Sequence, residues 1–116
     1  MKQHGLRPPR HLQPATRAWW REVVEDWHLE THHRMLLTLA GTAWDRAQQA
    51  RALVAKHGLA STTAAGGVKL SPFVRVEQDA MVTFARLLRE LDLDVAAPAD
   101  AKRPPMLRSV RGADAA

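Results

Sequence analysis

The chain of 116 residues contains no cysteine. This absence excludes disulfide-stapled folds, thiolate zinc sites and catalytic thiols. The sequence also has no apolar run of about 18 residues, the length that a membrane-spanning helix needs. Its first residues, MKQHGLRPPRHLQP, place charges and prolines where a secretory signal peptide has an apolar segment. We therefore expect an intracellular protein that does not enter a membrane.

Motifs for nucleotide or metal binding are missing as well. The glycine pair Gly66–Gly67 has no GxxxxGK[ST] frame, so it indicates a turn and not a phosphate-binding loop. His28 and His32 are four residues apart, but we expect the helix to be interrupted between them, and no HExxH motif or third ligand lies nearby. Four carboxylates between residues 22 and 30 follow the outer face of one predicted helix and do not converge from several elements. We expect no metal, no cofactor and no enzymatic activity.

Positive charge is concentrated towards the two ends of the chain. Residues 1–21 contain five basic and no acidic side chains. Residues 22–94 contain eight basic and ten acidic side chains, and residues 95–116 contain four basic and two acidic ones, which gives the net charge of +5. A nearly neutral body with basic ends is typical of proteins that bind a polyanion, because cations beside phosphates release counterions; a solubilising tail is the alternative. The candidate DNA-binding residues are Arg7, Arg10, Arg17, Arg21, Arg103, Arg108 and Arg111.

Three amphipathic helices are predicted between residues 14 and 94. The first, over about 15–27, carries an apolar stripe at spacings of three and four residues, formed by Trp19, Trp20, Val23, Val24 and Trp27. The second runs over 31–57, with Thr31 as its N-cap and Gly58 as its stop. Ser71 and Pro72 begin the third, which ends near residue 92. The segment GLASTTAAGGVKL between the two long helices predicts a small loop or β-hairpin.

The tryptophan stripe has two interpretations. Exposed tryptophans interleaved with Arg17 and Arg21 are suited to stacking on unpaired bases. A stripe confined to one helical face is more typical of a core or an interface, and we favour that interpretation.

The predicted fold class is all-α, with a long antiparallel helical hairpin preceded by a short helix. Residues 1–13 are expected to form a flexible basic arm, residues 14–94 a helical oligomerisation core, and residues 95–116 a disordered basic tail. Two helices of about 40 and 30 Å are too long for so small a core to cover. We therefore expect a homo-oligomer, and the predicted interface residues are Trp19, Trp44, Phe84 and Leu87.

Several short segments, in order along the chain, resemble one protein family. They are PPRHL before the first helix, KHGL at 56–59, the VRVEQDA entry to the third helix, and LLRELDLD followed by RPP. Together, over residues 7–112, they resemble the phage terminase small subunit family. Two positions depart from its pattern: Ser71 stands where the family often has His, and Asp92 where it has Gly. Both are structural positions and do not affect the function.

The resemblance implies a role in DNA packaging by a tailed phage or prophage. Proteins of this family form rings, recognise the viral genome end or packaging site, and present the double-stranded viral DNA to the large terminase subunit. The large subunit supplies the ATPase and the nuclease, so the resemblance implies a non-catalytic chain in the cytoplasm of the bacterial host. The tail arginines are alternatively contacts for the large subunit.

Two other functions fit a small basic helical protein. A transcription regulator needs a compact helix-turn-helix with a recognition helix of about eight to ten residues, and the predicted helix over 31–57 is too long for that role. A scaffold whose basic ends touch acidic proteins is the other alternative, and a salt-dependent DNA shift assay separates it from the DNA-binding candidates.

Overall fold

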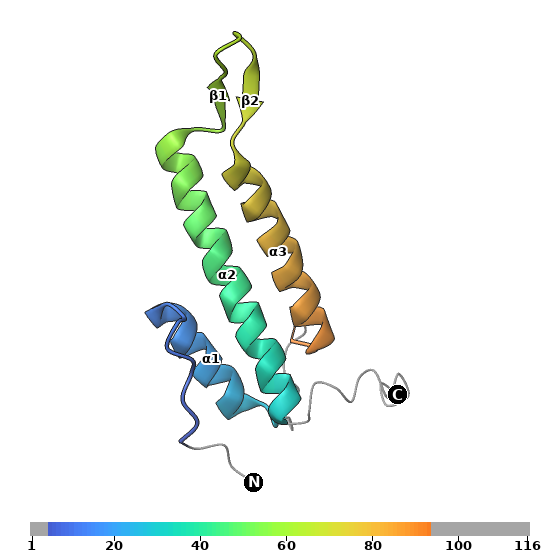
Figure 1. Cartoon of the computed structure of the whole chain (residues 1–116). Coiled ribbons are helices and arrows are strands. Elements are labelled where there is room, and N and C mark those ends of the chain that lie inside the picture. Colours follow the sequence, from blue (N-terminus) through green and yellow to red (C-terminus); the bar gives the residue numbers. More distant parts are fainter. Residues whose placement is uncertain (1–4, 94–116) are drawn as a thin grey trace.

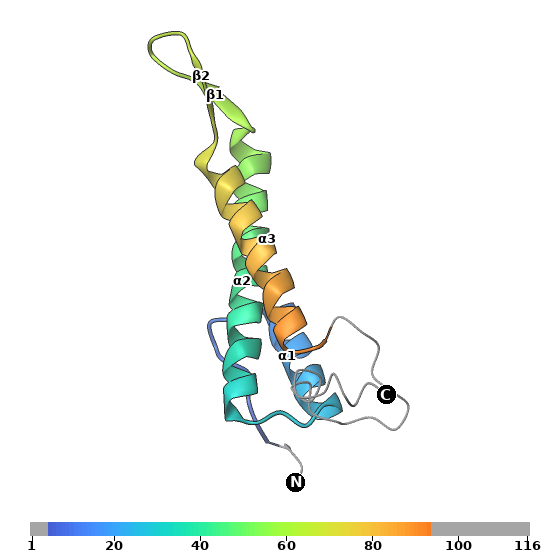
Figure 2. The same ribbon diagram turned by 90° about the vertical axis from the view of Figure 1, so that its right-hand side faces the viewer.

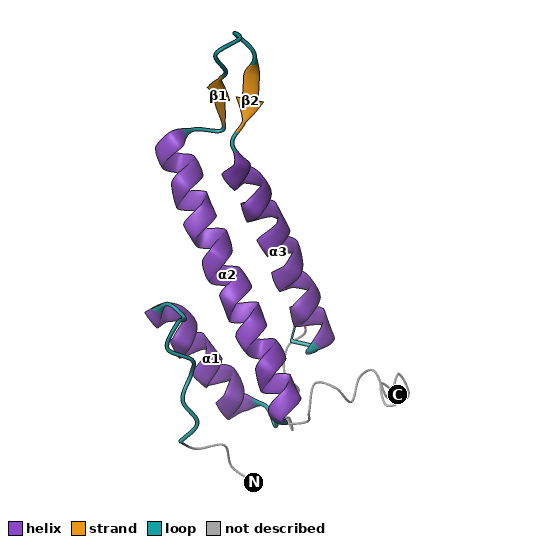
Figure 3. Ribbon diagram, viewed as in Figure 1, coloured by secondary structure: helices purple, strands orange, loops and turns teal. Residues whose placement is uncertain are grey.

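A computed structural model describes residues 5–93 of the chain. Its elements are α1 (Pro14–Asp26), α2 (Thr31–His57), β1 (Ala60–Thr62), β2 (Val68–Leu70) and α3 (Pro72–Glu90). Helices α2 and α3 lie side by side and antiparallel, α1 lies against the first part of α2, and the β-hairpin projects from the opposite end (Figures 1 and 3). The mostly helical fold with an antiparallel helical hairpin is therefore confirmed, and the connection between α2 and α3 is a β-hairpin.

Local sequence signals set most of the helix ends. Pro14 occupies the first turn of α1, and the N–H of Gly58, at φ +91°, donates to the carbonyl of Val54 to close α2. Ser71 Oγ accepts a hydrogen bond of 3.2 Å from the N–H of Phe73, which caps α3 as predicted. The N-cap of α2 is Glu30, one residue before the predicted Thr31.

The hydrophobic core lies where α1, the first half of α2 and the end of α3 meet. Its buried members are Leu12, Trp20, Val23, Val24, Trp27, Leu29, Leu37 and Leu91. The indole N–H of Trp20 donates to Thr38 Oγ1 at 3.2 Å, which satisfies the one polar group that this ring buries. The apolar stripe of α1 is therefore mainly core, as favoured from its spacing.

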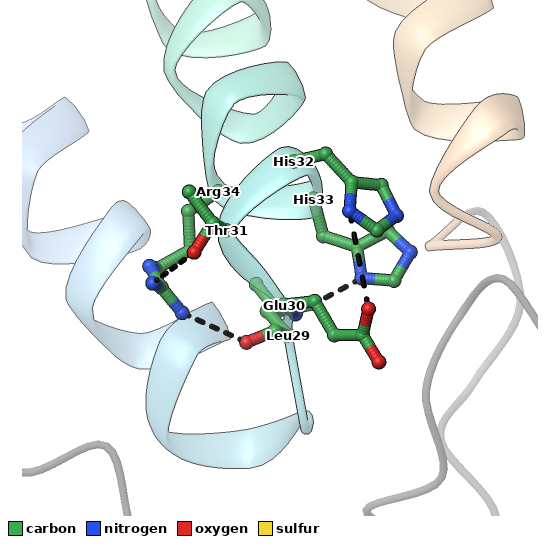
Figure 4. Close-up of polar contacts among 6 residues, drawn as sticks. All are labelled: Leu29, Glu30, Thr31, His32, His33 and Arg34. Carbon is green, nitrogen blue, oxygen red and sulfur yellow. Dashed lines mark hydrogen bonds and ion pairs between the residues drawn. The ribbon is translucent and has the colours of Figure 1, made fainter.

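The turn between α1 and α2 is fixed by side chains from the first turn of α2 (Figure 4). The N–H of Glu30 donates to His33 Nδ1 at 3.0 Å. The Arg34 guanidinium donates to the carbonyl of Leu29 at 2.8 Å and to Thr31 Oγ1 at 3.2 Å. These bonds hold the residues that join the two helices, and so they set the direction of α1 relative to α2.

His33 at this turn is a buried, neutral imidazole. Its side chain is buried, and its ring lies against that of His32 with 4.2 Å between the centroids. Burial and the neighbouring His32 lower the pKa of His33 below 6.5, although Glu30 opposes the shift. Because Nδ1 accepts the N–H of Glu30, the hydrogen bond requires that nitrogen to be unprotonated.

Candidate nucleic-acid and self-association surfaces

The last residues of the segment before α1 are docked on α2, and we call residues 5–13 the docked segment. Leu12 is 2% exposed and belongs to the core. The Thr42 hydroxyl donates to the carbonyl of Thr38 at 2.8 Å, so His11 Nε2–H is the donor in its own 2.8 Å bond to Thr42 Oγ1. The expected flexible arm therefore does not extend to residue 13, because its last residues are held by α2.

A carboxylate on α2 anchors the start of α1. Asp45 Oδ2 accepts the N–H of Gln13 at 2.8 Å, and Asp45 Oδ1 accepts the Thr16 hydroxyl at 2.6 Å. Gln13, the N-cap residue of α1, makes no side-chain capping bond of its own. The side chain of Asp45 thus provides from a neighbouring helix the acceptor and the negative charge that a helix N-terminus favours.

A glycine lets the docked segment approach this closely. A Cβ placed on Gly41 would lie 3.1 Å from Thr16 Cγ2 and 3.2 Å from both δ-carbons of Leu12. A side chain at position 41 would therefore crowd Leu12 and Thr16.

The predicted DNA-binding arginines of the N-terminal part lie on this docked segment and on α1. Arg17 donates through Nη1 to the carbonyls of Arg10 at 3.3 Å and Leu12 at 3.2 Å, so its guanidinium lies beside Arg10. Arg21 lies one helical turn after Arg17, and Arg7, Arg10 and Arg21 are exposed. The structure thus brings Arg10, Arg17 and Arg21 into one region, which we call the basic cluster.

The other predicted DNA-binding residues belong to the C-terminal tail. Arg103, Arg108 and Arg111 lie outside the described residues, as does the predicted disordered tail as a whole.

Three of the four predicted interface residues pack on one another within the chain. The ring centroids of Trp19 and Phe84 are 6.0 Å apart, and those of Trp44 and Phe84 are 5.2 Å apart, both pairs being tilted. With Ala15 and Thr16 these rings line an apolar hollow of about 270 Å³. Trp44 remains 44% exposed, so one side of this aromatic cluster faces solvent.

The fourth predicted interface residue, Leu87, lines a separate groove between α2 and α3. This groove has a volume of about 480 Å³. Leu39 and Val76 line it beside Leu87, and the small side chains of Ala43 and Ala80 form its buried floor. Leu39 is 56% exposed and Val76 37% exposed, so the groove presents apolar side chains to solvent.

Two kinds of site are not found among residues 5–93. No three His, Cys, Asp or Glu side chains are placed together so that they could hold a metal ion. None of α1, α2 and α3 combines the length and the apolar character that crossing a membrane requires.

Comparison with known proteins gives one match. A family described as "Phage terminase, small subunit" matches residues 16–106, which cover most of α1 and all of α2, the β-hairpin and α3. Neither a curated protein nor a solved structure matches the chain.

Proposed function

The chain belongs to the phage terminase small subunit family, and we propose that it self-associates, binds double-stranded viral DNA and presents that DNA to the large terminase subunit. Membership confirms the resemblance drawn from the sequence motifs and supports a role in phage genome packaging. The proposed site of action is the cytoplasm of the bacterial host. In this proposal the chain binds the DNA, and the large subunit carries out catalysis.

The basic cluster is the observation that carries DNA binding. Residues 5–21 contain no acidic side chain, and the exposed arginines among them lie on α1 or on the segment before it, whose junction is held by α2. Arginines attached to an ordered surface meet phosphates with less loss of conformational freedom than arginines on a free chain. The docked segment therefore supports phosphate binding by Arg7, Arg10 and Arg21, while Arg17 positions Arg10.

Self-association is supported by apolar surface that the chain leaves uncovered. Met35, Leu39, Met81 and Val82 are all more than half exposed on the two long helices. Repetition of the subunit would also multiply weak phosphate contacts. We propose a closed ring, in which each subunit contributes one basic cluster.

A transcription-regulator function gains no support from the helix lengths. α2 has 27 residues and α3 has 19, and the short α1 buries its apolar face in the core. None of them is an exposed recognition helix of about eight to ten residues.

Binding to a duplex that carries the phage genome end, measured over a range of salt concentrations, tests the proposal. Replacing Arg10 and Arg21 by Ala should weaken binding and reduce the slope of log K against log salt, by about 0.9 for each lost phosphate contact. The matched control replaces Arg51 and Arg75, which are exposed on α2 and α3. Equal effects of both double variants, or no effect of either, would contradict the assignment to the basic cluster.

Truncations separate the arm from the tail. Removing residues 1–13 would delete Leu12 from the core and Gln13 from its bond with Asp45, so the informative truncation removes residues 1–9. It removes Arg7 and leaves the basic cluster in place, so it should lower DNA affinity less than the replacement of Arg10 and Arg21. If only the tail truncation abolishes binding and its salt dependence, the DNA contacts lie in the tail.

A further inference from the structure

The β-hairpin has one apolar and one polar face. Its register pairs Ala60 with Leu70, Ser61 with Lys69, and Thr62 with Val68. Opposite residues share a face and neighbours along a strand alternate, so Ala60, Thr62, Val68 and Leu70 lie on one face, and Ser61 and Lys69 on the other. Val68 is 79% exposed and Leu70 is 59% exposed, so nothing in the described chain covers the apolar face.

The two strands of the hairpin are joined by backbone hydrogen bonds at its base and near its tip. Ser71 N–H donates to the carbonyl of Leu59 at 2.7 Å at its base, and Thr63 N–H donates to the carbonyl of Gly67 at 2.7 Å near its tip. In two perpendicular views the hairpin continues beyond the ends of α2 and α3 (Figures 1 and 2). An isolated two-stranded hairpin is only marginally stable in water, so packing on another surface would stabilise this one.

The same chain carries an apolar surface of a different shape, the groove between α2 and α3. Its floor includes Ala43, and the helical rise from there to His57, where α2 ends, is roughly 21 Å. The hairpin points away from the groove beyond that end, so a chain cannot place its hairpin in its own groove. A contact between the two surfaces must join two copies.

We propose that the apolar face of the hairpin of one copy docks in the α2–α3 groove of the next copy. The proposal rests on the self-association in the proposed function and identifies its surfaces. The apolar face of the hairpin carries no charge, and the groove lining includes one charge of each sign, Arg46 and Asp79, both on exposed residues. The hairpin face thus brings no charge of its own into the groove, and the contact covers Val68 and Leu70.

This contact joins unlike surfaces, so it is heterologous. Each copy offers one hairpin and one groove, and each contact uses one of each. Heterologous contacts form a ring when the rotation between copies closes, and a filament when it does not. The contact therefore accounts for an assembly larger than a dimer without any second interface.

Because the sequence contains no cysteine, thiols introduced by substitution are the only ones in the chain that a cross-linker can join. Single variants Val68→Cys in the hairpin and Leu39→Cys in the groove both change exposed residues. The two variants are mixed without DNA and treated with a short bis-maleimide, which does not demand disulfide geometry. The mixture should give a covalent dimer, and the double variant should give a ladder of covalent multimers. Ser61→Cys, on the polar face of the hairpin, is the matched control and should cross-link to Leu39→Cys at least tenfold less.

Three results would overturn the proposal. One is efficient cross-linking of Val68→Cys to itself but not to Leu39→Cys, which would indicate a hairpin-to-hairpin contact. Another is protection of Val68→Cys from a monofunctional maleimide by purified large subunit but not by Leu39→Cys copies, which would indicate that the hairpin contacts the large subunit. The third is a yield between Val68→Cys and Leu39→Cys no higher than that of the Ser61→Cys control. If this third result comes from a protein that light scattering shows to be multimeric, only the hairpin-to-groove contact is wrong, whereas a monomer would also contradict the proposed self-association.

Discussion

Asp45 on α2 accepts the hydroxyl of Thr16 on α1 at 2.6 Å, 29 residues away along the chain, and this bond is buried. The other oxygen of the same carboxylate accepts the N–H of Gln13. One side chain thus fixes the N-terminus of α1 and, with it, the segment that carries the basic cluster. The link connects the stability of the chain to the placement of its proposed DNA contacts.

We predict that Asp45→Asn destabilises the protein by about 1–3 kcal/mol, because an amide cannot serve as acceptor on both sides and leaves one buried donor unpaired. Urea unfolding followed by tryptophan fluorescence measures this change. Glu22→Gln, an exposed carboxylate on α1, is the control and should change the free energy of unfolding by less than about 0.5 kcal/mol. Equal stability of the Asp45 variant and the wild type would show that the anchor contributes nothing.

Gly41→Val should displace the docked segment. Atoms beyond Cβ would overlap Leu12 and Thr16, which already lie 3.1–3.2 Å from the Cβ position, at a cost of about 1–3 kcal/mol. DNA affinity should fall with it, because Arg10 loses its position. Ala52→Val changes an exposed residue of the same helix and controls for the helix propensity of valine. An unchanged melting temperature and unchanged DNA affinity of the Gly41 variant would refute this account.

His33 predicts a stability that depends on pH. Its folded pKa lies below the usual 6.5, so the unfolded chain binds the proton more readily, and the free energy of unfolding falls as the pH drops from 6.5 towards the lowered value. His33→Gln has no titrating group but keeps an acceptor at the same helix position. Its free energy of unfolding should change less than that of the wild type between about pH 7.5 and about pH 5. The control His28→Gln changes an exposed residue and should keep the wild-type dependence of the free energy of unfolding on pH. If that dependence is as steep in His33→Gln as in the wild type, His33 does not cause it.

Trp44→Ala should destabilise the chain by about 2 kcal/mol. A fully buried tryptophan costs about 3–5 kcal/mol when truncated, but Trp44 is 44% exposed, which lowers the expected cost. The loss comes from its contact with Phe84, whose ring centroid is 5.2 Å away. Trp44→Phe keeps an aromatic ring there and should recover at least half of the stability. A loss below about 0.5 kcal/mol for Trp44→Ala would show that the aromatic cluster does not stabilise the fold.

The helices were predictable because their ends are set by local chemistry. Pro14, Gly58 and Ser71 each act on the backbone within a few residues, and the expected ranges differ from the observed ones by two residues at most. The sequence left a loop and a β-hairpin as alternatives between α2 and α3, because strands of three residues carry little periodicity of their own.

The anchoring of α1 was not predicted, because it depends on contacts between distant residues. Residues 5–13 have no periodic apolar pattern, and nothing local shows that Leu12 meets Gly41 across the structure. The position of Asp45 gave no signal either, because it lies on the side of α2 opposite Ala43 and Ala47, among polar and small residues such as Thr38 and Gly41. Likewise, composition alone does not show that Arg17 uses its guanidinium to bind backbone carbonyls.

We propose above all that this terminase small subunit family member acts as a self-associated DNA-binding assembly. Light scattering coupled to gel filtration tests it most directly, with the protein alone and with a duplex carrying the phage genome end. We predict a discrete mass of several subunits without DNA, and a larger mass equal to that assembly plus DNA when the duplex is present. A protein that has the mass of one subunit at micromolar concentration and does not co-elute with the duplex would contradict the claim.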